Sequence, residues 1–318
     1  MKIWMIVAAS LVVLGLIVTM VAIALVDFDF KEFDMKKCEL NTHTVTEEFS
    51  GISVKTNISK VMFLPSLDGQ VRVECFERER ENHVVSVENG TLVIEMVDTR
   101  SWYHHISFFS FSVPQITVYL PAGEYGDLCV MGDTGDVSLP KDFSFASVDV
   151  SLDTGDVECA ASSTGLMKIK TSTGDVELEN FSADALEIRT STGDIEVSSL
   201  SCAGDVSVRV STGEADFENV TCQNLTTVGT TGDFSLNNVI ATGSMSIERD
   251  TGDVHLMRCD ATEVVITTDT GDVTGSFRTD KIVWASTDTG RVDVPKTTEG
   301  GRCEITTDTG NIKISIVP

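Results

Sequence analysis

The dipeptide Thr-Gly recurs through much of the chain at a nearly constant interval. Its glycine stands at positions 135, 155, 174, 193, 213, 232, 252, 271, 290 and 310, so that successive copies are 19 or 20 residues apart. Ten copies at one period are typical of a protein built from stacked structural repeats, each of which contacts only its neighbours.

Apolar and polar residues alternate on both sides of each glycine. Around Gly174 the apolar positions are Met167, Ile169, Val176 and Leu178, and the same offsets are apolar in nearly every copy. Alternation with a period of two sends successive side chains to opposite faces of an extended strand. Each repeat is therefore predicted to be a strand, a Thr-Gly-Asp turn, a second strand and a looser connection to the next repeat.

One coil of 19 or 20 residues cannot bury its own apolar face, whereas ten stacked coils can. The repeat thus predicts an all-β fold, a parallel β-solenoid (β-helix) of about ten regular coils, roughly 48 Å long at ~4.8 Å per coil. Glycine is expected where the turn requires positive φ, and Thr and Asp where side chains can bond the turn backbone.

The first 26 residues differ from the rest in having almost no charge. From Ile3 to Val26 no side chain is ionisable, and a helix of about 20 apolar residues spans the ~30 Å hydrocarbon core of a bilayer. Lys2 precedes this segment and Asp27 follows it, which predicts a single-pass transmembrane signal anchor with a cytoplasmic N-terminus and an extracytoplasmic solenoid. The alternative is a cleaved signal peptide with Ala22-Ile23-Ala24 at the cleavage site.

Four segments are predicted along the chain. Residues 1–26 form the anchor, 27–44 a charged juxtamembrane linker, 45–126 irregular opening β-coils with a cap, and 127–318 the regular solenoid. The residues after Val26 hold all 49 acidic residues and 22 of the 23 Lys and Arg residues, a formal charge of −27. Such a field repels nucleic acid and attracts divalent cations and basic partners.

The residue after the turn glycine is acidic in eight of the ten repeats. The acids are Asp136, Asp156, Asp175, Asp194, Glu214, Asp233, Asp253 and Asp272, and the last two repeats have Arg291 and Asn311. Carboxylates one coil apart repel each other unless each bonds its own turn backbone or they share a cation. Two interpretations stay open, a structural cap of the turns and a ladder that binds calcium. No other cofactor is predicted.

Eight cysteines are present, and none forms a Cys-x-x-Cys pair. Cys159, Cys259 and Cys303 stand at apolar positions of the repeat, which predicts that they are small core residues. Cys202 and Cys222 occupy the same position in consecutive coils, within the ~4.4–6.8 Å between Cα atoms that a disulfide requires. This pair can therefore be either bonded or free.

Aromatic residues are concentrated in one segment, Ser101 to Pro114. It contains Trp102, Tyr103, Phe108, Phe109 and Phe111. The segment precedes the regular coils, and it is predicted either to cap the open end of the first coil or to form a patch that contacts a partner or the membrane interface.

The segments STGDV, DTGDV and STGDI, with ENGTLVIE (Glu88 to Glu95) and ITVYLPAGEYGDL (Ile116 to Leu128), resemble the bacterial "putative adhesin" β-strand-repeat family. That family is a domain of unknown function found in cell-envelope proteins, and the resemblance covers roughly residues 45–318. It implies a role at the cell surface or envelope and supplies no catalytic residue.

Three functions are compatible with these features. The first is a non-enzymatic, membrane-anchored binding, adhesion or scaffold module at the bacterial envelope, with an envelope protein or a cell-surface glycan as partner. The second is a regulatory ectodomain that docks a membrane partner in envelope-stress signalling. The third is a polysaccharide-active β-helix enzyme, which the even spacing disfavours because it leaves no room for long cleft-forming loops. No catalytic residue is predicted.

Overall fold

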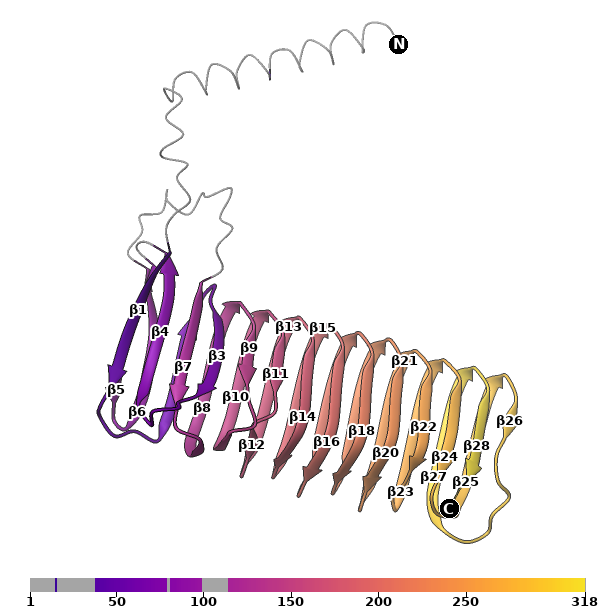
Figure 1. Cartoon of the computed structure of the whole chain (residues 1–318). Helices are drawn as coiled ribbons and strands as arrows, with labels where there is room; N and C mark the ends of the chain where they lie inside the picture. Colours follow the sequence, from indigo (N-terminus) through magenta and orange to yellow (C-terminus); the bar gives the residue numbers. More distant parts are fainter. Residues whose placement is uncertain (1–14, 16–37, 79–80, 99–113, 318) are drawn as a thin grey trace, which may run out of the picture.

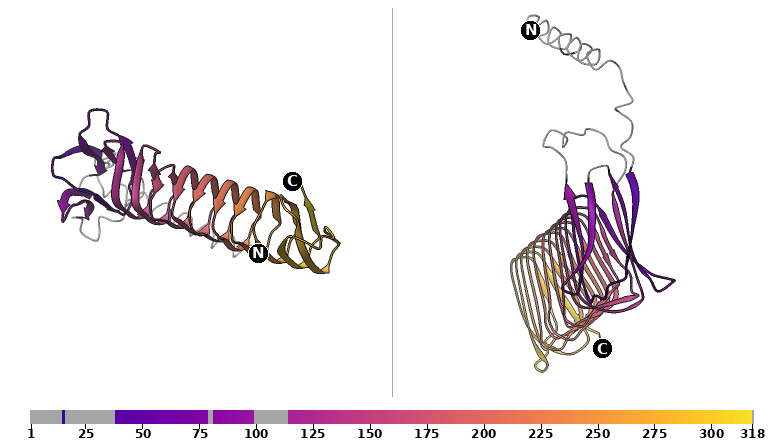
Figure 2. Two further views of the ribbon diagram at one scale, coloured as in Figure 1. Left: turned by 90° about the horizontal axis from the view of Figure 1, so that it is seen from below. Right: turned by 90° about the vertical axis from the view of Figure 1, so that its left-hand side faces the viewer.

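Two long β-sheets face each other and are wound from successive turns of the chain (Figures 1 and 2). The computed structural model describes residue 15 and residues 38–78, 81–98 and 114–317. Apart from residue 15, the predicted anchor lies outside the described residues, and so do Trp102, Tyr103, Phe108, Phe109 and Phe111. Among the residues described, no helix has the length and apolar character that a membrane crossing requires.

Each sheet has 14 strands. In order across sheet A they are β1 (Cys38–Val45), β4 (Val71–Arg78), β7 (Gln115–Leu120), β3 (Lys60–Pro65), β9 (Val137–Leu139), β11 (Val157–Cys159), β14 (Val176–Ala183), β16 (Ile195–Cys202), β18 (Ala215–Cys222), β20 (Phe234–Ala241), β22 (Val254–Cys259), β24 (Val273–Phe277), β28 (Ile312–Ile316) and β26 (Val292–Asp293). In the same direction across sheet B they are β5 (Glu81–Glu88), β6 (Thr91–Asp98), β2 (Gly51–Thr56), β8 (Gly123–Thr134), β10 (Phe143–Thr154) with β12 (Ser162–Ser163) beside it, β13 (Leu166–Thr173), β15 (Ala185–Thr192), β17 (Val206–Thr212), β19 (Leu225–Thr231), β21 (Ser244–Thr251), β23 (Glu263–Thr270), β27 (Gly301–Thr309) and β25 (Lys281–Thr289).

The regular coils follow the predicted pattern. A strand of sheet B leads through Thr-Gly-Asp into a strand of sheet A, and equivalent strands of successive coils pair in parallel. Met167 and Ile169 on β13 and Val176 and Leu178 on β14 are each no more than 1% exposed. The alternating apolar positions of all coils thus form one continuous core between the sheets, and the predicted parallel β-solenoid is confirmed.

The return from sheet A to sheet B is tighter than predicted. Only Asp184 separates β14 from β15, where the sequence pattern suggested a looser connection. The sixth residue after the turn glycine has positive φ in five coils, at Asn180, Ser199, Asn219, Asn238 and Arg258. A left-handed residue inside a paired strand bends it, and Asn tolerates that conformation better than most residues. This second bend replaces the expected loop.

The coils at both ends are stacked out of sequence order. At the C-terminal end, β27 and β28 lie between the coil of β23 and β24 and the coil of β25 and β26, so the coil of residues 281–293 is outermost. At the N-terminal end, β2 and β3 lie inside β6 and β7, which come later in the chain. Simple stacking in sequence order therefore fails at the first and last coils.

Antiparallel strands close the N-terminal end. In sheet A, β4 pairs antiparallel with β7 and β1 with β4, and in sheet B β5 pairs antiparallel with β6. Residues 38–44, which the sequence assigned to a linker, form most of β1. They are ordered as a strand because β4 offers them an open edge from Arg78 to Val71. We call β1, β4 and β5 the N-terminal cap.

Candidate functional sites in the turn column and the N-terminal cap

The turn glycines are required by both backbone conformation and space. Gly174 and Gly193 have φ of 141° and 138°, a region that residues with a Cβ rarely adopt. A Cβ at Gly193 would overlap the carbonyl oxygen of Gly174 in the preceding coil, and the same overlap recurs along the column. Only glycine lets the coils approach each other at this point.

The acidic residues after these glycines bond the neighbouring coil. The N–H of Asp175 donates to Asp156 Oδ1 at 2.9 Å, that of Asp194 to Asp175 Oδ1 at 2.8 Å, and that of Glu214 to Asp194 Oδ1 at 2.8 Å. The structural interpretation of the sequence predicted that each carboxylate would accept a hydrogen bond from the backbone of its own turn. Instead, each one accepts from the next coil, because parallel stacking brings that backbone N–H directly above it.

We call this series of carboxylate-to-backbone hydrogen bonds the carboxylate ladder. It departs from its regular pattern in two places. Glu214 accepts no hydrogen bond from the N–H of Asp233 within the described part of the chain, although bonding resumes from Asp253 to Asp233 at 2.8 Å. At the C-terminal end Asn311 follows Asp272 and Arg291 follows Asn311. The last two members thus appear in stacking order, not sequence order.

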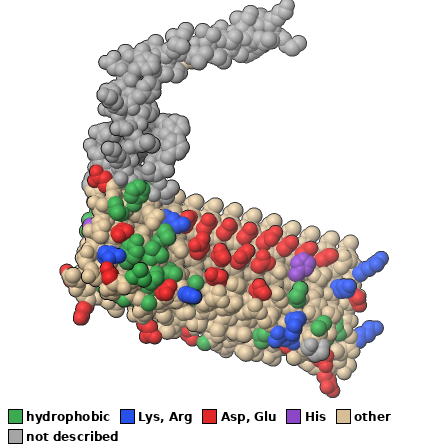
Figure 3. Space-filling view, viewed as in Figure 1, with side chains coloured by type: hydrophobic (Ala, Val, Ile, Leu, Met, Phe, Trp, Pro, Cys, Tyr) green, Lys and Arg blue, Asp and Glu red, His purple; other side chains and the backbone are tan. Residues whose placement is uncertain are grey.

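A second column of acids runs beside the ladder. Glu158, Glu177, Glu196 and Asp216 are directly paired neighbours on β11, β14, β16 and β18, and all four are exposed. Figure 3 shows the acidic side chains in rows across the coils. None of the four forms an ion pair with any other described residue, so the two columns produce a concentrated negative field.

These columns contain no compact cation site in the described structure. The one group of three or more potential ligand residues whose ligand atoms lie within 4.8 Å of one another there is Cys75, Glu77 and His83. The predicted calcium ladder has one carboxylate per coil, and its Oδ1 atoms already accept backbone hydrogen bonds. Calcium binding therefore stays a prediction.

Inside the turns, threonines recur at the third residue before the turn glycine, and three of them, Thr171, Thr287 and Thr307, donate to a glycine carbonyl. Thr171 Oγ1 donates to Gly155 O at 3.3 Å, and Thr307 Oγ1 donates to Gly271 O at 3.1 Å. Arg249 takes this place in its coil, where it is 1% exposed. Its guanidinium donates to the carbonyls of Gly232 and Gly213 and lies 3.9 Å from the Phe234 ring centroid.

Gly229 provides the space that the Arg249 side chain occupies. The two residues are paired neighbours on β19 and β21, and a Cβ at Gly229 would overlap Arg249 Nη1. Burial lowers the pKa of Arg249 to about 10. This pair was not identified from the sequence, although Gly229 and Arg249 both interrupt a column otherwise rich in Thr.

Most cysteines of the coils are core residues, as predicted, whereas Cys129 on β8 is only partly buried. Cys159, Cys259 and Cys303 are buried, and so are Cys202 and Cys222, both of which are free thiols. Burial raises the pKa of Cys159 and Cys303 to about 12. Thiols with such pKa values are protonated at neutral pH and poor nucleophiles.

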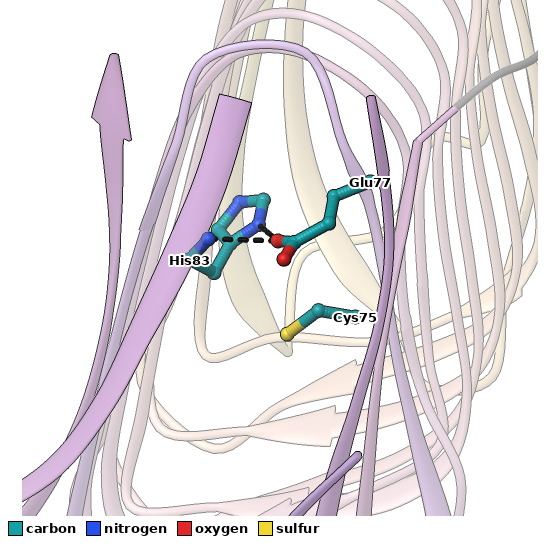
Figure 4. A group of neighbouring side chains, drawn as sticks. All are labelled: Cys75, Glu77 and His83. Atoms are coloured by element: carbon teal, nitrogen blue, oxygen red, sulfur yellow. Dashed lines mark hydrogen bonds and ion pairs between the residues drawn. The ribbon is translucent and has the colours of Figure 1, made fainter. Parts of the chain in front are cut away.

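The N-terminal cap holds a buried polar cluster that was not predicted from the sequence. Cys75 and Glu77 on β4 face His83 on β5 (Figure 4). The Glu77 Oε2 atom lies 2.8 Å from His83 Nδ1 and accepts from the His83 N–H at 2.7 Å. Burial, and then the charge of Glu77, raises the pKa of Cys75 to about 12.

A sequence signal for this cluster exists in the pattern Cys-x-Glu. Residues two apart on a strand share a face, so strand geometry places Cys75 and Glu77 on the same side of β4. His83 could not be added from the sequence, because its position depends on β5 crossing to the opposite sheet.

The N-terminal cap is also where the undescribed segments join the described chain. Cys38 pairs with Arg78, Glu81 pairs with Asp98, and Phe76 pairs with Gln115. The residues described on either side of the segment with the predicted aromatic patch are Asp98, at the end of β6, and Pro114, just before β7. A hydrophobic patch is visible at this end of the stack in Figure 3. Leu40 and Phe76, which are paired neighbours on β1 and β4, are both exposed.

The fold defines a class, the two-sheet parallel β-solenoid with an antiparallel cap. Within that class the chain belongs to the family described as Toastrack DUF4097, which matches residues 49–208 and 202–318. This confirms the resemblance to the uncharacterised bacterial domain family inferred from the repeat. A search of the curated proteins found no match.

Solved structures with a similar chain path come from Bacteroides fragilis and Parabacteroides distasonis. A "putative adhesin" from Bacteroides fragilis has 14% identity and a TM-score of 0.35, with 87% of this chain and 97% of that chain covered. A "putative lipid binding protein" from Parabacteroides distasonis has 14% identity, the same coverage and a TM-score of 0.46. A "putative adhesin" from the same organism has 11% identity, a TM-score of 0.42, and 88% and 98% covered. Likeness at this level carries no functional argument.

Proposed function

We propose that this chain is a non-enzymatic, membrane-anchored binding module, adhesive or scaffolding, on the extracytoplasmic side of a bacterial envelope. The observation that carries the proposal is that the repeat carboxylates serve as hydrogen-bond acceptors within the fold. In the turn column they accept backbone hydrogen bonds from the next coil, and the coils lack inserted loops between Gly135 and Gly271. Both features support a rigid rod rather than a catalytic cleft.

The direction of the rod follows from the predicted anchor. Cys38, the first residue of β1, lies in the N-terminal cap, so an anchor at Ile3 to Val26 would hold that end near the membrane. Fourteen strands at ~4.8 Å spacing then extend the other end by roughly 60 Å. The coil of β25 and β26 is the part presented farthest away.

The far end has properties suited to contact with an envelope protein. Its outermost strands β25 and β26 have no strand partner on their outer edge among the described residues, and Trp284 and Val292 are about half exposed. Residues 278–317 contain six basic and six acidic residues, against a formal charge of −26 for the whole chain. An extended segment of a partner could pair with such an edge through main-chain hydrogen bonds.

The anchor is tested by fractionation of cells that express the full-length chain or a version lacking residues 1–26. We expect the full-length protein in the membrane fraction, where protease added outside the cytoplasmic membrane can cleave it. The shortened protein should be absent from the membrane fraction and protected from that protease. Recovery of the full-length protein in the soluble cytoplasmic fraction would reject the proposed location.

The partner is tested by crosslinking the full-length protein in cells and identifying the captured material. Capture of one envelope protein in stoichiometric amount is the expected result. If that protein is a membrane-embedded regulator of envelope stress, the module acts as a regulatory ectodomain. Capture of glycan without protein would overturn strand pairing at the far end, and turnover of a captured polysaccharide would overturn the non-enzymatic proposal.

A further inference from the structure

The buried cluster of the N-terminal cap has the composition of a transition-metal site. The Cys75 sulfur, a Glu77 oxygen and a His83 ring nitrogen all lie within 4.8 Å of one another. Cys75 is fully buried, and Glu77 and His83 are 2% and 5% exposed. Thiolate, carboxylate and imidazole are the three protein donors that zinc combines in its sites, at ~2.0–2.3 Å from the ion.

The backbone already places these donors on one point between the sheets. Cys75 and Glu77 extend from the same face of β4, and His83 reaches toward them from β5 in the opposite sheet (Figure 4). In a tetrahedral site, ligand atoms are separated by roughly 3.3–3.8 Å, and these three residues would fill three of the four positions, with a water molecule in the fourth. Side-chain adjustment of about 1 Å would bring atoms that are at most 4.8 Å apart into that range.

The neighbouring polar groups orient the donors in the way that metal ligands are usually held. Asn41 Nδ2 donates to Glu77 Oε1 at 2.6 Å, and the His83 N–H donates to Glu77 Oε2. Thr56 Oγ1 lies 3.4 Å from His83 Nε2, which leaves Nδ1 directed at the cluster. Outer-shell contacts of this kind fix the tautomer and ring orientation of a ligating histidine.

Charge favours a divalent ion at this position. A buried carboxylate and a buried thiolate together carry two negative charges, which a zinc ion neutralises, while the histidine ligates in its neutral form. The thiol proton is released to solvent when the sulfur binds. The resulting group has no net charge, which reduces the cost of burying it.

We propose that Cys75, Glu77 and His83 bind one zinc ion, which joins β4 to β5 and thereby fastens sheet A to sheet B in the N-terminal cap. The site is separate from the carboxylate ladder, whose oxygen ligands suit calcium. The role assigned to the ion is structural, because each of the three ligand residues is at most 5% exposed.

The test is metal titration of the full-length protein, purified in detergent and treated with a chelator. Zinc is measured by calorimetry and cobalt by absorption, since a thiolate ligand gives cobalt a near-ultraviolet charge-transfer band. We expect one ion per chain, a cobalt–thiolate band and a higher Tm with zinc than after chelation.

Two cysteine variants separate this site from the other thiols. Cys75→Val should abolish the cobalt–thiolate band, and Cys303→Val should leave it unchanged, since Cys303 lies in a column between Val264 and Val283. His83→Asn gives a second loss of binding if Cys75→Val fails to fold. Asn41→Ala should weaken binding by about 10–100-fold, as expected of an outer-shell partner.

Two results would overturn the proposal. One is the absence of stoichiometric zinc binding by folded, chelator-treated wild-type protein. The other is a cobalt–thiolate band that survives in folded Cys75→Val or His83→Asn protein, because the metal would then bind elsewhere.

Discussion

Apolar residues at equivalent repeat positions are buried to different extents at the two ends of the stack. In the outermost parallel coil of the N-terminal end, Leu92 and Ile94 on β6 and Ile116 on β7 are fully buried, since the N-terminal cap covers them. At the C-terminal end Val283 and Ala285 on β25 are only partly buried. Equivalent apolar residues are thus buried or half-open according to whether another layer follows.

This difference indicates that the interior coils and the two ends of the stack have different structural roles. The interior coils are interchangeable layers that bury the core and bond one another through the turn column. The N-terminal cap ends the core, and the C-terminal end leaves part of it available. The effects of substitutions on stability can therefore be compared between regular interior coils and positions that depart from the repeat pattern.

The largest effect is expected for glycine in the turn column. Gly193→Ala should destabilise the protein by at least ~3 kcal/mol, since the methyl group adds a backbone clash to an unfavourable φ of 138°. Gly123→Ala is the matched control, because Gly123 has a similarly unusual φ of 157° but a Cβ there would meet no atom within 4 Å. Its cost should be smaller, about 1–2 kcal/mol.

Thermal and denaturant unfolding of both glycine variants measure the difference. Equal losses at the two positions would show that backbone conformation alone, and not the close approach of the coils, requires glycine in the turns.

A second prediction concerns the coil that replaces threonine by arginine. Gly229→Thr alone should cost about 1–3 kcal/mol because it overlaps the Arg249 guanidinium. The double variant Gly229→Thr with Arg249→Thr restores the threonine column and removes a buried guanidinium whose Nε and Nη1 have no partner among the described residues. It should recover most or all of the lost stability.

A double-mutant cycle on the free energy of unfolding checks this coupling, which should be about 1–3 kcal/mol. Strict additivity of the two substitutions would contradict the packing of Arg249 into the space at Gly229.

A smaller effect is expected where the ladder is interrupted. Glu214→Asp should stabilise the protein by about 0.5 kcal/mol, because the shorter carboxylate can accept from the Asp233 N–H as its neighbours do. Asp194→Glu should destabilise by a similar amount by breaking the bond from Glu214. Changes of the same sign in both variants would mean that side-chain length does not control the ladder.

The smallest effect concerns calcium. If the ladder binds calcium, adding millimolar calcium to chelator-treated, metal-free protein should raise Tm in the wild type, and less so in a variant with Asp175, Asp194 and Glu214 replaced by Asn, Asn and Gln. An unchanged Tm of the metal-free wild type on addition of calcium would remove the calcium interpretation and leave the ladder with a purely structural role.

Much of the interior could be predicted from the sequence because each coil repeats a short local pattern. Alternation indicates the inward direction of Val176 and Leu178, and Gly174 marks the turn. The second bend was missed because its residues vary among Asn, Ser and Arg, and only Asn180, Asn219 and Asn238 carry a recognisable signal.

The ends could not be predicted because their order depends on long-range pairing. Residues 301–316 look like a final coil, but β27 pairs with both β23 and β25. In the same way, His83 joins Cys75 and Glu77 only because β5 pairs with β6 in the opposite sheet. No local periodicity encodes either arrangement.

The central claim is that the regular coils are a structural scaffold and that contact with the partner is made at the C-terminal end. The most direct test places a photo-crosslinking amino acid at Trp284, or at Glu196 in the exposed acidic column, in the full-length protein in cells. The account predicts specific capture of an envelope protein from position 284 and none from position 196. Capture from position 196 alone would contradict it and assign recognition to the acidic face of the coils.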